Sequence, residues 1–333
     1  MNKSKSLLSH NESDFIKGIL IILIIVGHNY YIIHGLNFHN SLKDFLYAFH
    51  IHSFFYLPVL YNVPDFSFYR VKKDFIRLFT PYTIFFIILL ICNIFIHNYN
   101  YNLLESFWGY LSGSSNLLSI VTGTQFLWFL PAMFSFLIIR NLYFTYIKAK
   151  IPILLISTFT LLILALGLGH NVDINLYCPL GIFYALSNFS IAIFLRFIIE
   201  NYSNKIWFKL FFPIAFVLIL TIYSITDFNR YTYYPFIYII IPIIAFPTIF
   251  LLSKTKLTRK KNVFIFLGKL SLPLYLFHQI IYNLLCLFLD KSHFNNYNTI
   301  ILGVVVFILT LFLNIMLIYI LKFLFPKIYK LFS

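Results

Sequence analysis

The chain has 333 residues, of which 61% are hydrophobic, 21% are aromatic and only 11% are charged. Soluble chains are typically about half apolar and about one quarter charged, so a soluble enzyme, a disordered protein and a disulfide scaffold are all excluded. The formal net charge of +15 would suggest nucleic acid as a partner of a soluble chain. Its distribution along this sequence indicates a membrane instead, with no nucleic-acid partner.

Apolar windows of about 20 residues, the length that crosses a bilayer core, recur along the whole chain. They predict an all-α integral membrane protein with about ten transmembrane helices. A single membrane domain then occupies residues 1–333, with no soluble domain. The predicted spans are 15–35, 44–62, 75–97, 126–147, 151–169, 176–199, 207–225, 232–252, 263–288 and 299–325.

The basic residues predict the direction of these spans. With the N-terminus in the cytoplasm, 22 of the 25 Lys and Arg residues fall at cytoplasmic ends, and only Lys43, Arg230 and Lys291 fall outside. Positive residues stay on the cytoplasmic side during insertion, so both termini are expected to be cytoplasmic. Most of the positive charge then orients helices and meets anionic lipid headgroups.

The first predicted span carries ionisable residues on one face. Lys17 and His28 are separated by 11 residues, which leaves them about 20° apart around a helix and about 16 Å apart along it. Asp14 lies on the same face, so a carboxylate and an amine precede an imidazole at membrane depth. Such groups are costly in hydrocarbon and are functional candidates. The pattern is equally consistent with Asp14 and Lys17 marking the interface and His28 making a packing hydrogen bond.

Two further predicted spans carry deep histidines. The second holds His50 and His52, whose spacing differs from the i, i+4 pattern of helical metal ligands, so we predict no metal site there, although a two-histidine site is an alternative. The ninth holds Ser271 and His278, which are seven residues apart and share a face. Pro273 is expected to kink the helix between them.

Arg70, Lys73 and Arg77 follow one another at helical spacing and share a face at the cytoplasmic mouth of the third span. Asp74 lies four residues after Arg70 and three before Arg77, where it can pair with either. A solvated basic flank explains this pattern, but a stripe of cations beside a cavity would also hold phosphate groups.

Together these residues suit one chemistry. A phosphorylated donor would reach a reactive centre within the bilayer from the cytoplasm, and a histidine base would deprotonate an acceptor hydroxyl that then attacks the donor carbonyl. A transporter or exporter of a polysaccharide or small metabolite, using the same helices as a conduit, is the alternative function.

Several segments, in this order on the predicted spans, resemble the integral-membrane acyltransferase family 3 over nearly the whole chain. Asp14-x-x-Lys17-Gly18 with His28 is similar to the family's Arg/Lys-x10-His signature. The other matching segments are Phe49-His50 with Phe54-Phe55, Arg77-Leu78-Phe79-Thr80-Pro81-Tyr82, Leu127-Trp128-Phe129-Leu130, and Gly268-Lys269-Leu270-Ser271 with Tyr275-Leu276-Phe277-His278. The chain departs from the family pattern by having Asp74 in place of an Arg, His52 in place of a Pro, and Pro58-Val59 in place of Ser-Gly.

The resemblance implies a multi-pass enzyme of the bacterial inner membrane that transfers an acyl group, usually acetyl, from cytoplasmic acyl-coenzyme A to a hydroxyl of a surface or wall glycan. Acetyl-coenzyme A is then a donor substrate and no cofactor is permanently bound; the acceptor is a glycan or a lipid-linked saccharide. The resemblance makes His28 the catalytic residue. We assign Lys17 and Asp14, which share its helix face, to the catalytic site with it. The donor-binding residues are then Arg77, Lys73, Arg70 and Lys17, and the supporting residues are His50, Trp128, Ser271 and His278.

Overall fold

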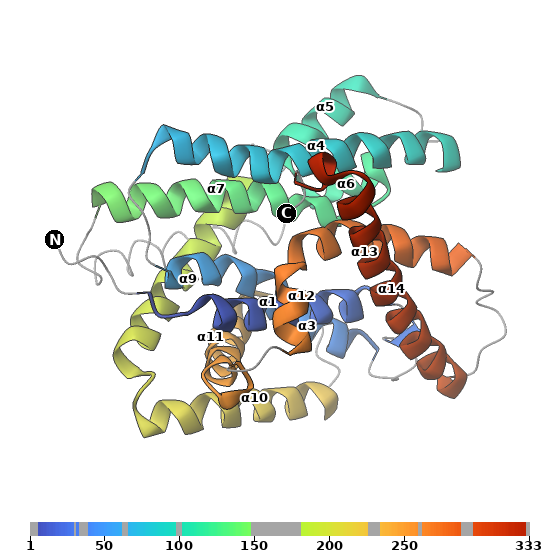
Figure 1. Ribbon diagram of the computed structural model, residues 1–333. Coiled ribbons are helices and arrows are strands. Elements are labelled where there is room, and N and C mark those ends of the chain that lie inside the picture. Colours follow the sequence, from blue (N-terminus) through green and yellow to red (C-terminus); the bar gives the residue numbers. More distant parts are fainter. Residues whose placement is uncertain are drawn as a thin grey trace. The chain divides into compact units, whose positions relative to one another are not determined.

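The computed structural model describes residues 6–29, 31–32, 39–61, 66–97, 102–147, 181–225, 234–258, 262–287 and 296–330. Every regular element in these residues is a helix, as the sequence predicts (Figure 1). The chain forms two compact units, the first made of Met1–Leu7 and Phe55–Phe197 and the second of Leu8–Phe54 and Ile198–Ser333. The predicted span at 151–169 and the beginning of that at 176–199 lie outside the described residues.

In the first unit, α4 packs against α7 and α6, and α6 packs against α5. The side-chain amide of Asn93 on α4 donates to the carbonyls of Ile120 and Val121 at 2.9 and 3.1 Å, which satisfies a buried polar group between apolar helices. The elements of this unit are η1 (Leu57–Leu60), α4 (Phe68–His97), α5 (Leu103–Ser112), α6 (Ser115–Thr122), η2 (Phe126–Trp128), α7 (Phe129–Leu142), the π-helix η3 (Tyr143–Ile147) and most of α9 (Ile182–Tyr202).

In the second unit, α1 packs mainly against α12 and also against α13 and α11, while α14 packs against α13, and α10 against α11. Helix α3 (His39–Tyr56) contributes its residues up to Phe54 to this unit. The other elements are α1 (His10–Gly27), α10 (Ile206–Ile225), α11 (Tyr234–Ser253), η6 (Lys256–Thr258), α12 (Val263–Lys269), α13 (Ser271–Leu287), α14 (Asn296–Leu324) and α15 (Pro326–Tyr329).

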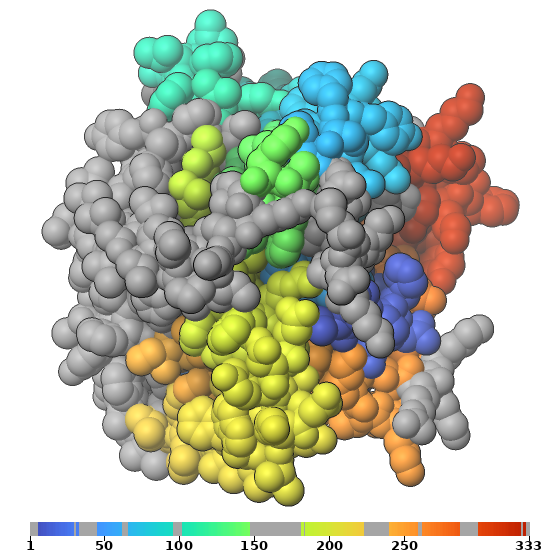
Figure 2. All heavy atoms as spheres, turned by 90° about the vertical axis from the view of Figure 1, so that its left-hand side faces the viewer, coloured from blue at the N-terminus to red at the C-terminus, as the bar shows by residue number. Residues whose placement is uncertain are grey.

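Three stretches of the described chain are helical, long and apolar enough to cross a bilayer: Phe68–Phe95, Phe126–Tyr146 and Thr299–Leu324. The bent pair α12–α13 makes a fourth if it counts as one span. In α14 only 22% of the most apolar 18-residue stretch is buried. Helix α10, yellow in Figure 2, likewise exposes Trp207, Phe211 and Val217 at the surface. Helices that contact lipid are expected to expose apolar side chains in this way. The count of about ten spans stays a prediction.

Two predicted spans, 15–35 and 263–288, are interrupted, although the sequence predicted a continuous helix for the first and a kinked helix for the second. The first ends at Gly27, and the side chain of Asn29 then accepts a hydrogen bond from the Ile32 N–H at 3.1 Å and donates to the carbonyl of Gly303 at 2.8 Å. The first of these bonds satisfies a backbone N–H just after the break, and the second ties this segment to α14.

The bend in the ninth span lies at Leu270, where α12 and α13 meet at 85°. The expectation that Pro273 kinks the helix between Ser271 and His278 is therefore wrong. Pro273 is the third residue of α13, and a proline is tolerated in a first turn because the N–H groups there have no intrahelical acceptor. Ser271 and His278 consequently lie on one uninterrupted helix.

Candidate active site

Three histidines and a tyrosine of the second unit lie together and form what we term the histidine cluster: His28, Tyr47, His50 and His278. The ring centroids of His28 and His278 are 5.1 Å apart, and the Tyr47 ring lies 5.5 Å from that of His28 and 5.1 Å from that of His50. His50 and His278 are buried, whereas His28 and Tyr47 are half-buried. The structure thus brings together histidines from three predicted spans and adds a tyrosine that the sequence did not single out.

Main-chain carbonyls orient two of these rings. Nδ1 of His278 lies 2.6 Å from the carbonyl oxygen of Tyr275, and Nδ1 of His50 contacts the carbonyl oxygen of Leu46. A carbonyl can only accept a hydrogen bond, so Nδ1 carries the proton in both neutral rings. The lone pair of each ring is then on Nε2, which is the nitrogen able to take up a proton.

His28 is held differently, because it follows the last residue of α1. Its backbone N–H closes the final turn by donating to the carbonyl of Ile24 at 3.1 Å. The hydroxyl oxygen of Tyr47 lies 3.1 Å from Nδ1 and 3.3 Å from Nε2 of the His28 ring. A side-chain hydroxyl, which can donate or accept, therefore contacts the ring of the candidate base.

Helices α1 and α12 cross so closely that their backbones touch (Figure 1). A Cβ atom added at Gly18 would overlap the backbone carbonyl of Phe264, and one added at Gly268 would overlap that of Asp14. Glycine is therefore required at both positions, as is common where membrane helices approach closely. The crossing joins two segments that the sequence matched to family motifs, and it explains their glycines by packing.

Lys17 precedes Gly18 at this crossing and forms an ion pair with Asp14, the two charged atoms being 3.0 Å apart. About one third of the Lys17 side chain, 32%, is exposed, against 15% for Asp14. The ammonium group is thus oriented by the carboxylate and remains accessible to an anion. Lys17 and His28 are 11 positions apart, which corresponds to about 16 Å along the helix.

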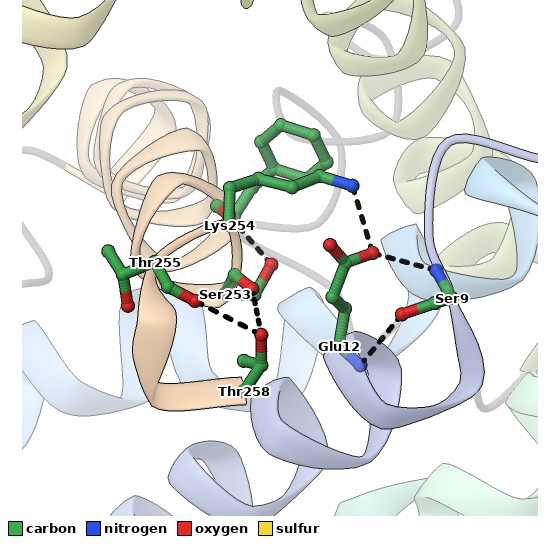
Figure 3. Close-up of polar contacts among 7 residues, drawn as sticks. Ser9, Glu12, Ser253, Lys254, Thr255 and Thr258 are labelled. Atoms are coloured by element: carbon green, nitrogen blue, oxygen red, sulfur yellow. Dashed lines mark hydrogen bonds and ion pairs between the residues drawn. The ribbon is translucent and has the colours of Figure 1, made fainter. Parts of the chain in front are cut away.

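A second ion pair fixes the N-terminus of α1 to the end of α11 (Figure 3). Lys254 donates to Glu12 at 2.9 Å, and Glu12 also accepts from the backbone N–H of Ser9 at 2.7 Å, which makes it part of a capping box. Burial by itself would raise the pKa of Glu12, but the hydrogen bond from Ser9 and the contact with Lys254 together hold this pKa below its ordinary value.

The predicted donor residues belong to the first unit and lie on α4. Arg77 pairs with Asp74 at 3.4 Å, and 48% of its side chain is exposed. Arg70 is half-buried and Lys73 is exposed. The structure confirms that these residues lie on one helix. Asp74 pairs with Arg77, one of the two arginines that its spacing allows.

Two arginines that the sequence analysis treated only as orienting charges are buried in the same unit. Arg140 donates to the carbonyl of Pro58 at 3.1 Å, and Arg196 donates to those of Val59 and Tyr61, the latter at 3.3 Å. Their side chains are 9% and 6% exposed. They hold the turn η1, which contains the Pro58-Val59 pair where the family pattern has Ser-Gly, so their role in the structure is to stabilise that turn.

The other predicted site residues lie outside the histidine cluster. Trp128, in the first unit, stacks on Phe55 at a centroid distance of 6.4 Å and contacts Tyr184 at 4.7 Å. Ser271 is the first residue of α13, about 10 Å along the helix from His278. His52 is half-buried, in contrast to the buried His50.

Among the described residues, no group of three or more His, Cys, Asp and Glu side chains is arranged to hold a metal ion. The cluster itself offers imidazole rings, whose ring nitrogens can accept and donate a proton. A tyrosine hydroxyl beside one of them can orient it.

In a comparison with known families, a family model described as an acyltransferase domain matches residues 10–319. The matched stretch contains every residue of the histidine cluster, the α1–α12 crossing and the basic face of α4. Comparison with curated proteins and comparison with solved structures each gave no match.

Proposed function

The chain belongs to the acyltransferase 3 family of membrane proteins, and on this premise we propose that it transfers an acyl group, most simply acetyl, from cytoplasmic acyl-coenzyme A to a hydroxyl of a cell-surface or cell-wall glycan. The observation that carries the proposal is the presence, within the matched domain, of a histidine cluster whose rings can accept a proton. The enzyme would act in the bacterial inner membrane.

His28 is the proposed general base. A nitrogen of its ring takes the proton of the acceptor hydroxyl while the hydroxyl oxygen attacks the thioester carbonyl carbon. The carbon–sulfur bond then breaks, the thiolate of coenzyme A leaves, and it takes up the proton from the imidazolium. The products are an ester of the glycan and free coenzyme A, and His28 returns to its neutral form.

His28 is favoured over His50 and His278 as the base because it is the least buried of the three. His50 and His278 are 0% and 1% exposed, so an acceptor would have to displace neighbouring side chains to reach them, whereas part of His28 is accessible. We propose that the two buried rings support His28 and the substrate.

The donor contacts are proposed on two separate surfaces. Lys17, held by Asp14, would bind phosphate groups of coenzyme A about 16 Å from His28 along α1. Arg70, Lys73 and Arg77 form a further donor-binding face on the first unit, where the exposed guanidinium of Arg77 can make charge-assisted hydrogen bonds.

The proposed topology has ten spans with both termini in the cytoplasm, because 22 of 25 basic residues then lie inside. In a variant whose native cysteines are replaced, Leu104→Cys should react with a membrane-impermeant maleimide from outside and Lys256→Cys only from inside. Both native side chains are exposed, so reagent access is assured. Labelling of both from the same side would contradict this topology.

The activity is tested with membrane vesicles that contain the protein and lipid-linked saccharides, supplied with radiolabelled acetyl-coenzyme A on the cytoplasmic face. Label on the saccharide, absent from vesicles without the protein, is the expected result. Movement of unlabelled saccharide across the membrane without transfer of label would contradict acyl transfer and would indicate an exporter.

A further inference from the structure

Tyr47 on α3 contacts both the candidate base and a second histidine of the cluster. Its hydroxyl oxygen lies within hydrogen-bond distance of the His28 ring, at 3.1 Å from Nδ1 and 3.3 Å from Nε2. Its ring stands edge-on to the ring of His50, with centroids 5.1 Å apart. The Tyr47 ring also packs beside Gly27, the last residue of α1, where an added Cβ atom would lie in ordinary contact at 3.4 Å from Cε2 of Tyr47.

A histidine acts as a base only if the correct nitrogen carries its lone pair, and this is fixed by the hydrogen bond that the other nitrogen makes. In His50 and His278 a main-chain carbonyl four or three residues earlier in the same helix fixes the tautomer. His28 follows the last residue of its helix, and the Tyr47 hydroxyl contacts both of its ring nitrogens.

On the basis of the proposed function, we infer that Tyr47 is a positioning residue for His28. The Tyr47 oxygen accepts the N–H of one ring nitrogen, which leaves the lone pair of the other nitrogen for the proton of the acceptor hydroxyl. The same N–H donates to Tyr47 after the ring has been protonated, and the phenol keeps its own proton throughout.

A phenol suits this place in the fold better than a carboxylate would. It is neutral, so it can orient an imidazole among apolar helices without the cost of burying a second charge. A charge-assisted hydrogen bond from the imidazolium is stronger than one from the neutral ring, so Tyr47 also stabilises the protonated state that forms during the reaction.

The test is Tyr47→Phe, which keeps the aromatic ring and its contacts and removes only the hydroxyl. We expect kcat for acetyl transfer to fall by roughly 10- to 100-fold, a part of the contribution of a positioned base, with the KM for acetyl-coenzyme A unchanged. Tyr282→Phe is the matched control, because Tyr282 is a buried tyrosine of the same unit that packs against Tyr31 and Val306, and it should retain the wild-type kcat.

A second readout does not depend on acyl transfer. With ¹⁵N-labelled histidine in lipid bilayers, the His28 signals, assigned by their loss in His28→Gln, should show one dominant tautomer in the wild type and a changed tautomer distribution in Tyr47→Phe. If Tyr47→Phe fails to fold, 3,5-difluorotyrosine at position 47 keeps the shape of the side chain and should shift the same signals.

A normal kcat in Tyr47→Phe together with unchanged His28 signals would overturn the inference, and so would unchanged signals with difluorotyrosine. Absence of acyl transfer by the wild type would refute the proposed function alone, since the nuclear magnetic resonance comparison still decides whether Tyr47 fixes the His28 ring.

Discussion

The histidine cluster in the second unit and the basic face of α4 in the first hold their polar groups in contrasting ways. Helix α1, which His28 follows, crosses α12 in backbone contact at Gly18 and Gly268. The buried rings of the cluster, His50 and His278, are oriented by main-chain carbonyls. On α4, by contrast, Arg77 is half exposed and its ion pair with Asp74 is long. The contrast is consistent with the proposed functions, since fixed geometry suits proton transfer and an exposed ion pair suits binding of a charged donor.

The largest effect is expected at the α1–α12 crossing. Gly18→Val or Gly268→Val places a side chain where a backbone carbonyl lies, so the helices must separate, at a cost of about 3 kcal/mol or more. We expect loss of the folded protein in detergent, measured by size-exclusion chromatography. Gly27→Ala on the same helix makes only ordinary contacts and should remain folded. Normal folding of both valine variants would show that the backbones do not touch.

The next effect concerns the arginines that hold η1. Arg140→Met leaves the carbonyl of Pro58 without its donor in a buried place, which should destabilise the first unit by roughly 1–3 kcal/mol. A lower thermal midpoint is expected for the purified protein, whereas Lys72→Met, at an exposed position, should leave it unchanged. Equal thermal midpoints of the two variants would contradict a stabilising role for Arg140.

A smaller effect, on binding alone, is expected at the basic face. Arg77→Ala should raise the dissociation constant for acetyl-coenzyme A roughly tenfold, because one charge-assisted contact to phosphate is lost. Lys72→Ala is the control, since Lys72 lies on a different face of α4 and should leave the affinity unchanged. Affinities are measured by isothermal titration calorimetry. Equal affinities of the two variants for acetyl-coenzyme A would contradict the proposed role of Arg77 in donor binding.

The smallest effect is expected for Glu12, at the exposed end of α1. Its pKa is lowered in the folded protein, so the stability it contributes is present above its unfolded pKa of about 4.5 and is lost as the pH falls through the folded value. Glu12→Gln should therefore lower the free energy of unfolding at pH 7 by at most about 1 kcal/mol, seen as a slightly lower thermal midpoint, and by less at acidic pH. A difference that grows on acidification would contradict the assigned ion pair.

The sequence alone predicted the helical class, singled out His28, His50 and His278 as site candidates, and placed Lys17 and Asp14 on one helix face. Those predictions depend on hydropathy and helical spacing, which are local properties. Tyr47 was missed because nothing in the 25 tyrosines of the chain distinguishes it until α3 is placed beside α1. The burial of Arg140 was missed for a related reason, since its acceptor is 82 residues away in sequence.

Helix breaks were the other limit. Pro273 was expected to kink a helix, but it lies in the first turn of α13, where a proline is tolerated. The bend occurs instead at Leu270, a residue type that does not by itself predict a helix break. Likewise, α1 ends at Gly27, and Asn29 just beyond it donates to the carbonyl of Gly303, a partner 274 residues away in sequence. Composition of a single segment does not reveal such a partner.

The central claim, that His28 is the base of the histidine cluster, is tested most directly by the rate of acetyl transfer in His28→Gln. An amide can form hydrogen bonds but cannot take up the proton, so the rate should fall at least about 100-fold while expression and insertion stay normal. His10→Gln, at an exposed position of the same helix, should be unaffected, and His50→Gln and His278→Gln should be milder than His28→Gln. A well-expressed His28→Gln protein that transfers acetyl at a near-normal rate would contradict the account.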